Sequence, residues 1–90
     1  MQRLDSSAIR AAVAARSSLE ETLLFELRLD NLEYERAPLR GTLWIGVSAP
    51  GARLPGADLT GWMLFGSSLP DADLRDAKIR DATLTDADLS

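Results

Sequence analysis

The stretch GADLTGWMLFGSSLPDADLRDAKIRDATLTDADLS, residues 56–90, carries a large aliphatic residue at every fifth position. Together with Leu54, which lies five residues before Leu59, the series is Leu54, Leu59, Leu64, Leu69, Leu74, Ile79, Leu84 and Leu89. An α-helix repeats about every 3.6 residues and a strand every second residue, so neither buries this series on one face. The period instead indicates a solenoid, in which each short repeat packs only against its neighbours.

A small residue stands two positions before most of these aliphatic residues, and glycine or aspartate closes nearly every unit. Three units match this pattern best: Ala57-Asp58-Leu59, Ala72-Asp73-Leu74 and Ala87-Asp88-Leu89. The sequence resembles the pentapeptide repeat family, whose motif is A(D/N)LXX, closely over residues 52–90 and less closely over residues 37–51. The resemblance does not extend to the N-terminal quarter of the chain.

The resemblance implies an all-β fold, a right-handed quadrilateral β-helix with one pentapeptide on each side of the square. The central aliphatic residue and the small residue two positions before it would point inward, and the other three would face outward. Residues 28–90 would then form about three coils, a rod on the order of 15 Å long. The corner glycines stand where the chain must turn.

Residues 1–27 are expected to form a short N-terminal α-helical cap. Ser7 can cap a helix through SAIRAAVAAR, and SLEE, residues 18–21, has the form of a capping box that opens a second helical stretch. The expected apolar stripe is Ile9, Val13, Leu23, Leu24 and Leu27. A cap over the end of the repeats and a docking helix for another protein both fit this pattern.

One side of the expected rod is apolar on its outer surface. Residues one coil apart stack in this fold, which gives two outward columns of large apolar side chains: Leu23, Leu43 and Met63, and Phe25, Ile45 and Phe65. On the next coil the columns end in Thr83 and Thr85. The other sides carry polar residues and proline at the outward positions.

Both tryptophans lie on the same side. Trp44 occupies a central position, whereas Trp62 stands where the motif has alanine. An indole at that position predicts either a local bulge or an outward-turned ring that enlarges the apolar surface.

An exposed apolar surface normally has a cover. Either the N-terminal helices fold back across it, or a protein partner or a second copy of the chain binds there. For the second case the predicted partner-binding residues are Leu43, Ile45, Trp62, Met63 and Phe65, since methionine and aromatic residues are favoured anchors in interfaces.

The composition argues against several other functions. The chain has no cysteine and no histidine, and its net charge is -4. We therefore expect no catalytic residues, no metal and no cofactor, and no enzyme activity. The acidic balance gives nucleic acid no reason to bind, and no apolar run is long enough for a membrane span. The expected compartment is the cytoplasm.

Two alternatives remain. Long, acidic, dimeric members of the family inhibit or protect the topoisomerase gyrase as mimics of DNA, but here charges alternate down the columns Glu33, Arg53, Asp73 and Asp58, Lys78. A net charge of -4 also falls short of the roughly nine negative charges that 15 Å of duplex would require. The corner aspartates form a ring rather than an axial stripe: Asp71, Asp76, Asp81 and Asp86. The second alternative is a repeat peptide whose Asp or Thr side chains are modified by an enzyme.

Overall fold

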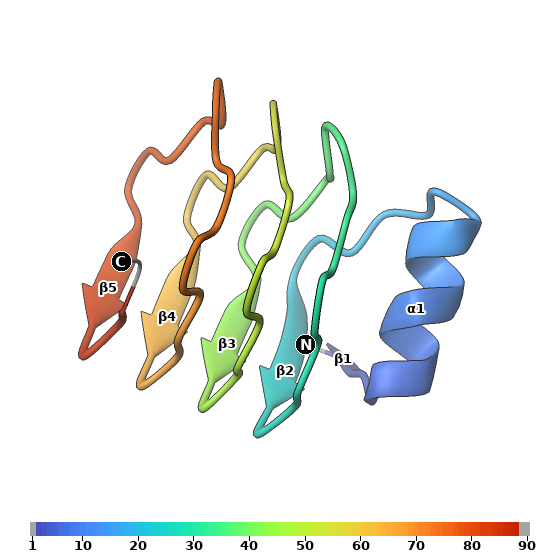
Figure 1. The fold of residues 1–90 in the computed structure, drawn as a ribbon, viewed down its shortest axis with the longest axis horizontal. Helices are drawn as coiled ribbons and strands as arrows, with labels where there is room; N and C mark the ends of the chain where they lie inside the picture. The colour runs from blue at the N-terminus through green and yellow to red at the C-terminus, as the bar shows by residue number, and fades with distance from the viewer. Residues whose placement is uncertain (1, 89–90) are drawn as a thin grey trace.

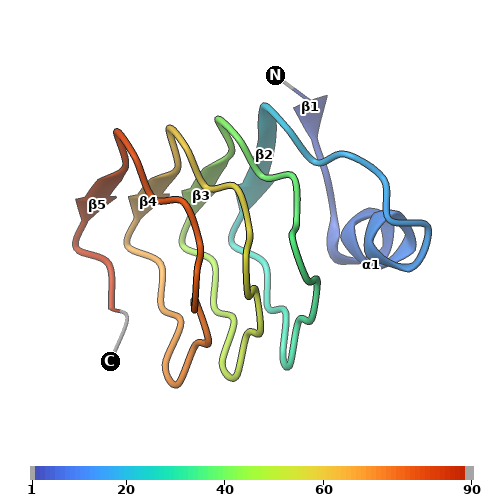
Figure 2. The same cartoon turned by 90° about the horizontal axis from the view of Figure 1, so that it is seen from above.

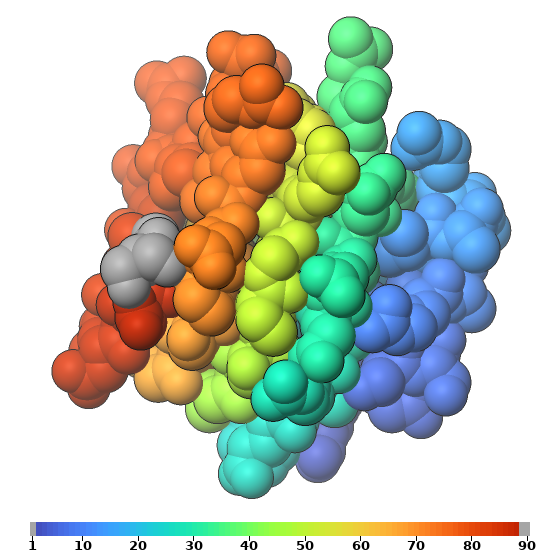
Figure 3. Space-filling model, in the orientation of Figure 1, coloured from blue at the N-terminus to red at the C-terminus, as the bar shows by residue number. Residues whose placement is uncertain are grey.

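The computed structural model describes residues 2–88, and the chain winds through successive coils that stack along one axis (Figure 1). Each coil contributes one short strand to a five-stranded parallel sheet whose strands follow chain order. The strands are β1 (Gln2–Arg3), β2 (Thr22–Phe25), β3 (Leu43–Ile45), β4 (Met63–Phe65) and β5 (Thr83–Thr85). Neighbouring coils lie in direct contact as parallel bands (Figure 3). The fold is a β-helix solenoid.

The pairing between coils has a constant register. In the sheet, Trp44 pairs with both Leu24 and Leu64, and the same spacing continues from β4 to β5. Isolated parallel bridges with this spacing form three further columns, which include the pairs Ser48–Ser68, Arg53–Asp73 and Asp58–Lys78. Parallel pairing therefore recurs at four places around the coil, and the five-residue period of the sequence is the distance from one place to the next.

The interior of the solenoid is filled as the sequence predicts. The central aliphatic side chains and the small residues two positions before them are fully buried, among them Leu54, Leu59, Leu64, Leu69, Ala52 and Ala57. Burial decreases toward the last coil, where Ile79 is 39% exposed and Leu84 is 44% exposed. Leu89, the last member of the series, lies outside the described residues.

Helix α1 (Ser6–Ala14) lies against the N-terminal end of the stack, beyond β2 (Figure 2). Its N-cap is Asp5, whose side chain accepts a hydrogen bond from the amide of Ala8 at 2.8 Å, so the prediction of Ser7 as the cap is wrong. Ile9 is the buried residue of the helix, and Arg10 donates to the carbonyl of Asp30 at 3.2 Å. The helix thus covers central side chains that would otherwise end in water.

The second predicted helix does not exist. The stretch that begins at Ser18 enters the first coil, and Thr22–Phe25 is strand β2 rather than a helical turn. Glu21 has a φ of 54°, the left-handed conformation of the other corners, which no α-helix contains. Leu24 points into the core and Leu23 points outward, so the two are not neighbours on one helical stripe. The local capping signal is outweighed by pairing with β3.

The corners of the coils have positive φ, and at some of them the side chain of the preceding coil leans over the backbone. Gly51 has a φ of 69°, and a Cβ atom there would lie 2.8 Å from Oδ1 of Asn31. At Gly66, with a φ of 59°, a Cβ atom would meet nothing within 4 Å. Only the first position combines conformational strain with a steric clash.

We therefore expect Gly51→Ala to lower the free energy of unfolding by more than Gly66→Ala. The left-handed backbone costs alanine about 1–2 kcal/mol at either position, and the displacement of Asn31 adds to this cost at residue 51 alone. Urea denaturation of the two variants beside the unmodified protein measures both values. Equal losses would mean that Asn31 does not lean over Gly51.

Candidate functional site

Six outward side chains on β2, β3 and β4 form what we call the apolar face: Leu23, Phe25, Leu43, Ile45, Met63 and Phe65. The register stacks them in two columns, as the sequence predicts. Phe65 is the most exposed of them at 36%, and the others are half-buried by their neighbours. On β5 the same columns continue as the exposed Thr83 and Thr85.

Helix α1 does not fold back over the apolar face, because it lies at the end of the stack rather than beside the sheet (Figure 2). A side chain of β1 does reach it. The guanidinium of Arg3 lies 5.0 Å from the centroid of the Phe25 ring, in the geometry of a cation–π contact. The described part of the chain therefore covers the face only at its N-terminal edge.

Trp62 is not part of the surface. Its side chain is 0% exposed and packs edge-to-face on Trp44, with ring centroids 5.3 Å apart and an interplanar angle of 89°. The register is 20 residues on both sides of it, so there is no bulge. Both predictions for this residue, an outward ring or a bulge, are wrong. The remaining predicted partner-binding residues, Leu43, Ile45, Met63 and Phe65, do lie together on the face.

The interior has room for two indole rings because other inward positions of the repeat hold small residues. Ala49 is a central residue where most units have leucine, and it is 0% exposed. Thr42 and Ala82 stand one coil before and one coil after Trp62. Ser67 also joins two coils from inside, since its Oγ accepts a hydrogen bond from Val47 N at 3.1 Å and donates to the carbonyl of Trp44 at 3.3 Å.

Two residues of the apolar face, Leu23 and Phe25, are absent from the predicted partner-binding set. The sequence contains their signal, because both lie one coil before Leu43 and Ile45 in the same frame. Both are predicted to lie in the outward columns, but their assignment to the helical cap left them out of the predicted partner-binding set. Strand β2 extends the apolar face by one coil toward the N-terminus.

Outside the apolar face, charges alternate between neighbouring coils. Arg53 pairs in register with Glu33 before it and Asp73 after it, and Asp58 pairs with Lys78. A hydrogen bond from the Thr60 hydroxyl lowers the pKa of Asp58, and Arg40 and Lys78 lower it further. These contacts are exposed and add little stability, but they make the surface partly self-neutralising.

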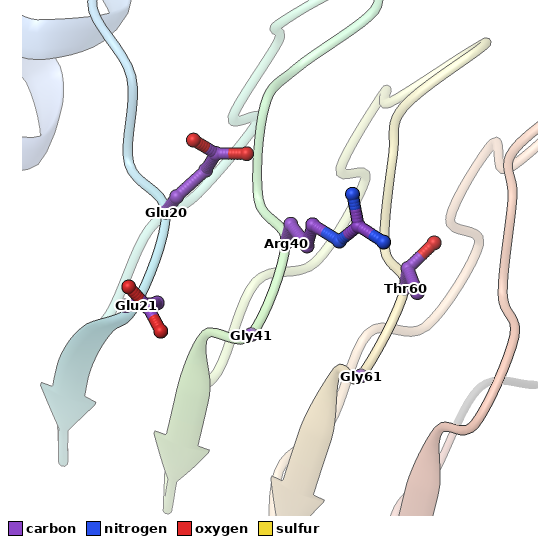
Figure 4. Close-up of a pocket in the computed structure, with 6 residues that line it drawn as sticks. All are labelled: Glu20, Glu21, Arg40, Gly41, Thr60 and Gly61. Carbon is purple, nitrogen blue, oxygen red and sulfur yellow. The ribbon is translucent and has the colours of Figure 1, made fainter.

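A surface pocket of about 430 Å³ lies along one corner of the first coils, where Glu20, Arg40 and Thr60 come from successive turns (Figure 4). Glu20 and Arg40 are exposed, and the pocket carries charges of both signs. Within residues 2–88 no group of three or more acidic residues, histidines or cysteines could hold a metal ion. In the same range, no helix has the length and apolar character needed to cross a membrane.

Comparison with known proteins gives one match. The family model described as "Pentapeptide repeats (8 copies)" matches residues 64–90, which include β4 and β5. No curated protein and no solved structure matches the chain. The matched segment shares its five-residue frame and its pairing register with the coils before it, back to β2. Residues 64–90 thus match the model of the pentapeptide repeats.

Proposed function

We propose that this chain is a non-catalytic protein-interaction module that binds a protein partner through its apolar face. The observation that carries the proposal is the contrast between this side and the others. The outward positions of β2, β3 and β4 are all large and apolar, whereas the outward positions of the other three columns are polar or proline. The largest contiguous apolar patch on a monomeric protein is often a functional surface.

The proposal includes a detailed form for the fold. The four pairing columns and the turn at every fifth residue support a right-handed quadrilateral β-helix, with α1 as the cap of its first coil. Such a scaffold suits binding rather than catalysis, because its side chains are held in fixed rows on flat sides. The expected absence of enzyme activity rests on the lack of histidine and cysteine in the sequence.

The experiment that tests this function compares the partner proteins that three immobilised forms of the chain retain. These are the unmodified chain, the double variant Met63→Asp/Phe65→Asp, and the control variant Ser48→Asp/Ser68→Asp. The control adds the same charge on a neighbouring side of the coil, where the two serines also pair in register. We expect a protein retained by the unmodified chain and by the control, and lost from the variant of the apolar face. Circular dichroism must first show that all three forms are folded.

Light scattering of the free protein, coupled to size exclusion, identifies the case in which the partner is a second copy. A dimer that dissociates only in Met63→Asp/Phe65→Asp would show self-association through the face. Retention of the same proteins by all three forms, together with an unchanged monomer mass, would exclude the apolar face as an interaction site.

A further inference from the structure

We propose that the apolar face takes an amphipathic α-helix of the partner, about three turns long, with a lysine or arginine that lies over the ring of Phe65 beside Asp86. This inference rests on the proposed function and specifies the chemistry of the partner. Three features of the face support it: its axial spacing, its small area, and a cation that the chain itself places at the opposite end.

The spacing of the face matches a helix better than an extended segment. Side chains within each column repeat at the strand spacing of about 4.8 Å, and the two columns stand about 7 Å apart because they are two residues apart on each strand. A helix presents a new row of side chains about every 5.4 Å along its axis. Over three coils the two repeats differ by only about 1 Å, whereas an extended segment repeats about every 7 Å on one side. A helix along the solenoid axis can therefore place apolar side chains between the columns.

The area of the face is too small for a stable homodimer. Two columns over three coils cover on the order of 15 by 10 Å, about 150 Å². A stable interface between two folded proteins buries about 800 Å² on each partner. A short helix needs far less, because its few apolar anchors contribute most of the binding energy. The area therefore favours a single helical segment over a second copy of the chain.

The N-terminal end of the face shows how a cation is held there. Arg3 lies over the ring of Phe25, and the exposed Glu26 follows Phe25 at the corner of the same coil. The guanidinium thus lies over an aromatic face, which attracts a cation, and the acidic Glu26 is adjacent to Phe25 in sequence without forming an ion pair with Arg3. This contact comes from within the chain, so the partner is not needed at this end.

The C-terminal end of the face has an aromatic ring without the cation, and the acidic corner residue there belongs to the next coil. Phe65 occupies the position of Phe25 in the same column, and Asp86 stands at the corner directly after the Gly66 corner. A Cβ atom at Gly66 would meet nothing within 4 Å, so this corner is open. Among residues 2–88, no arginine or lysine lies over the Phe65 ring, and Asp86 forms no ion pair. A cation from the partner completes this end as Arg3 completes the other.

The test is a selection from a displayed library of random peptides of about 16 residues, biased toward helix-forming residues. The unmodified protein is expected to enrich peptides with apolar residues at i, i+3, i+4 and i+7 and a lysine or arginine at one end. Against the folded variant Met63→Thr/Phe65→Thr, which copies Thr83 and Thr85 of β5, this enrichment is expected to disappear.

Two milder variants separate the cation site from the apolar contact. Phe65→Leu keeps the face apolar but removes the ring, and Asp86→Asn removes the charge. Both are expected to retain the apolar pattern and to lower the affinity of a selected basic peptide about fivefold. Asp71→Asn is the matched control, because Asp71 is also an exposed aspartate at a positive-φ corner and lies on a different side of the coil. It is expected to leave the affinity unchanged.

The outcomes that overturn the inference are distinct from those that overturn the function. Selected peptides that require the face but are extended, proline-rich or acidic at their ends would refute the basic helix and leave the interaction function standing. A homodimer that dissociates in Met63→Thr/Phe65→Thr would likewise refute the basic helix and leave the interaction function standing. If no enriched peptide distinguishes the unmodified protein from that variant and the protein is a monomer, both proposals are wrong.

Discussion

Trp62→Ala is expected to lower the free energy of unfolding by about 3–5 kcal/mol, although it restores the residue that the repeat motif prefers. The indole is fully buried, and its removal leaves a cavity beside Trp44 as well as the loss of an edge-to-face contact worth about 0.5–1.5 kcal/mol. Neither indole N–H has a hydrogen-bond partner among the described residues, so alanine also removes a buried donor at a gain of about 1–3 kcal/mol. The cavity outweighs this gain because the coils above and below fix the backbone.

Urea denaturation followed by far-ultraviolet circular dichroism measures the change. Thr83→Ala, on the exposed strand β5, serves as the control and is expected to change stability by less than about 0.5 kcal/mol. A Trp62→Ala protein as stable as the unmodified one would show that the indole is not a part of the core, and would return this residue to the surface where the sequence pattern suggested it.

Ile9→Ala is the second substitution with a large expected effect, a loss of about 2–5 kcal/mol. The side chain is 1% exposed and is the buried contact of α1 with the core, beside the partly buried Ala12 and Val13. Alanine is the best helix former, so the helix itself loses nothing and the whole cost reflects packing. The matched variant Ile79→Ala removes the same atoms at the other end of the stack, where the side chain is 39% exposed. It is expected to cost about 1 kcal/mol or less.

Thermal and urea unfolding of the two isoleucine variants measure this asymmetry between the ends. Equal losses at both ends would show that Ile79 is covered in solution, by a neighbouring molecule or by a further segment. A small loss at both would show that α1 does not pack on the first coil.

The stacked coils could be predicted from the sequence because a single physical requirement determines the period of five. Each leucine must reach the axis from its own side, and Leu54, Leu59 and Leu64 do so in turn. The register followed without further information, since residues one coil apart have to pair. The same frame placed Met63 and Phe65 over Leu43 and Ile45.

Strand β2 was assigned to the helical cap because two signals compete in the same residues. Ser18 to Glu21 has the form of a capping box, and Ser18 does accept a hydrogen bond from the amide of Glu20 at 3.2 Å. That local turn leads into a strand rather than a helix because Leu19 and Leu24 are five apart and both are buried. Pairing with β3 adds backbone hydrogen bonds and core contacts, which exceed the roughly 1 kcal/mol of a helix cap.

Trp62 was misplaced because a motif describes average volume at one position, and the core responds to the total volume of a layer. Ala49 is the compensating residue, small at a central position and only five residues after Trp44. Large and small residues exchanged between positions can fill the same space. A search for small residues at central positions would have predicted room for the second indole.

The side chain that leans over Gly51 has a consequence for how the coils find their order during folding. Coils with similar repeats could stack out of sequence, and a slip by one full coil would keep every leucine inward. The corners discriminate between these arrangements: the first coil has long corner side chains, including Asn31 and Arg36, and the next has glycine at Gly51 and Gly56 to receive them. A slipped stack would press those side chains onto the aspartates of a later coil, Asp71 and Asp76. The corner residues thus permit each coil to stack on only one following coil.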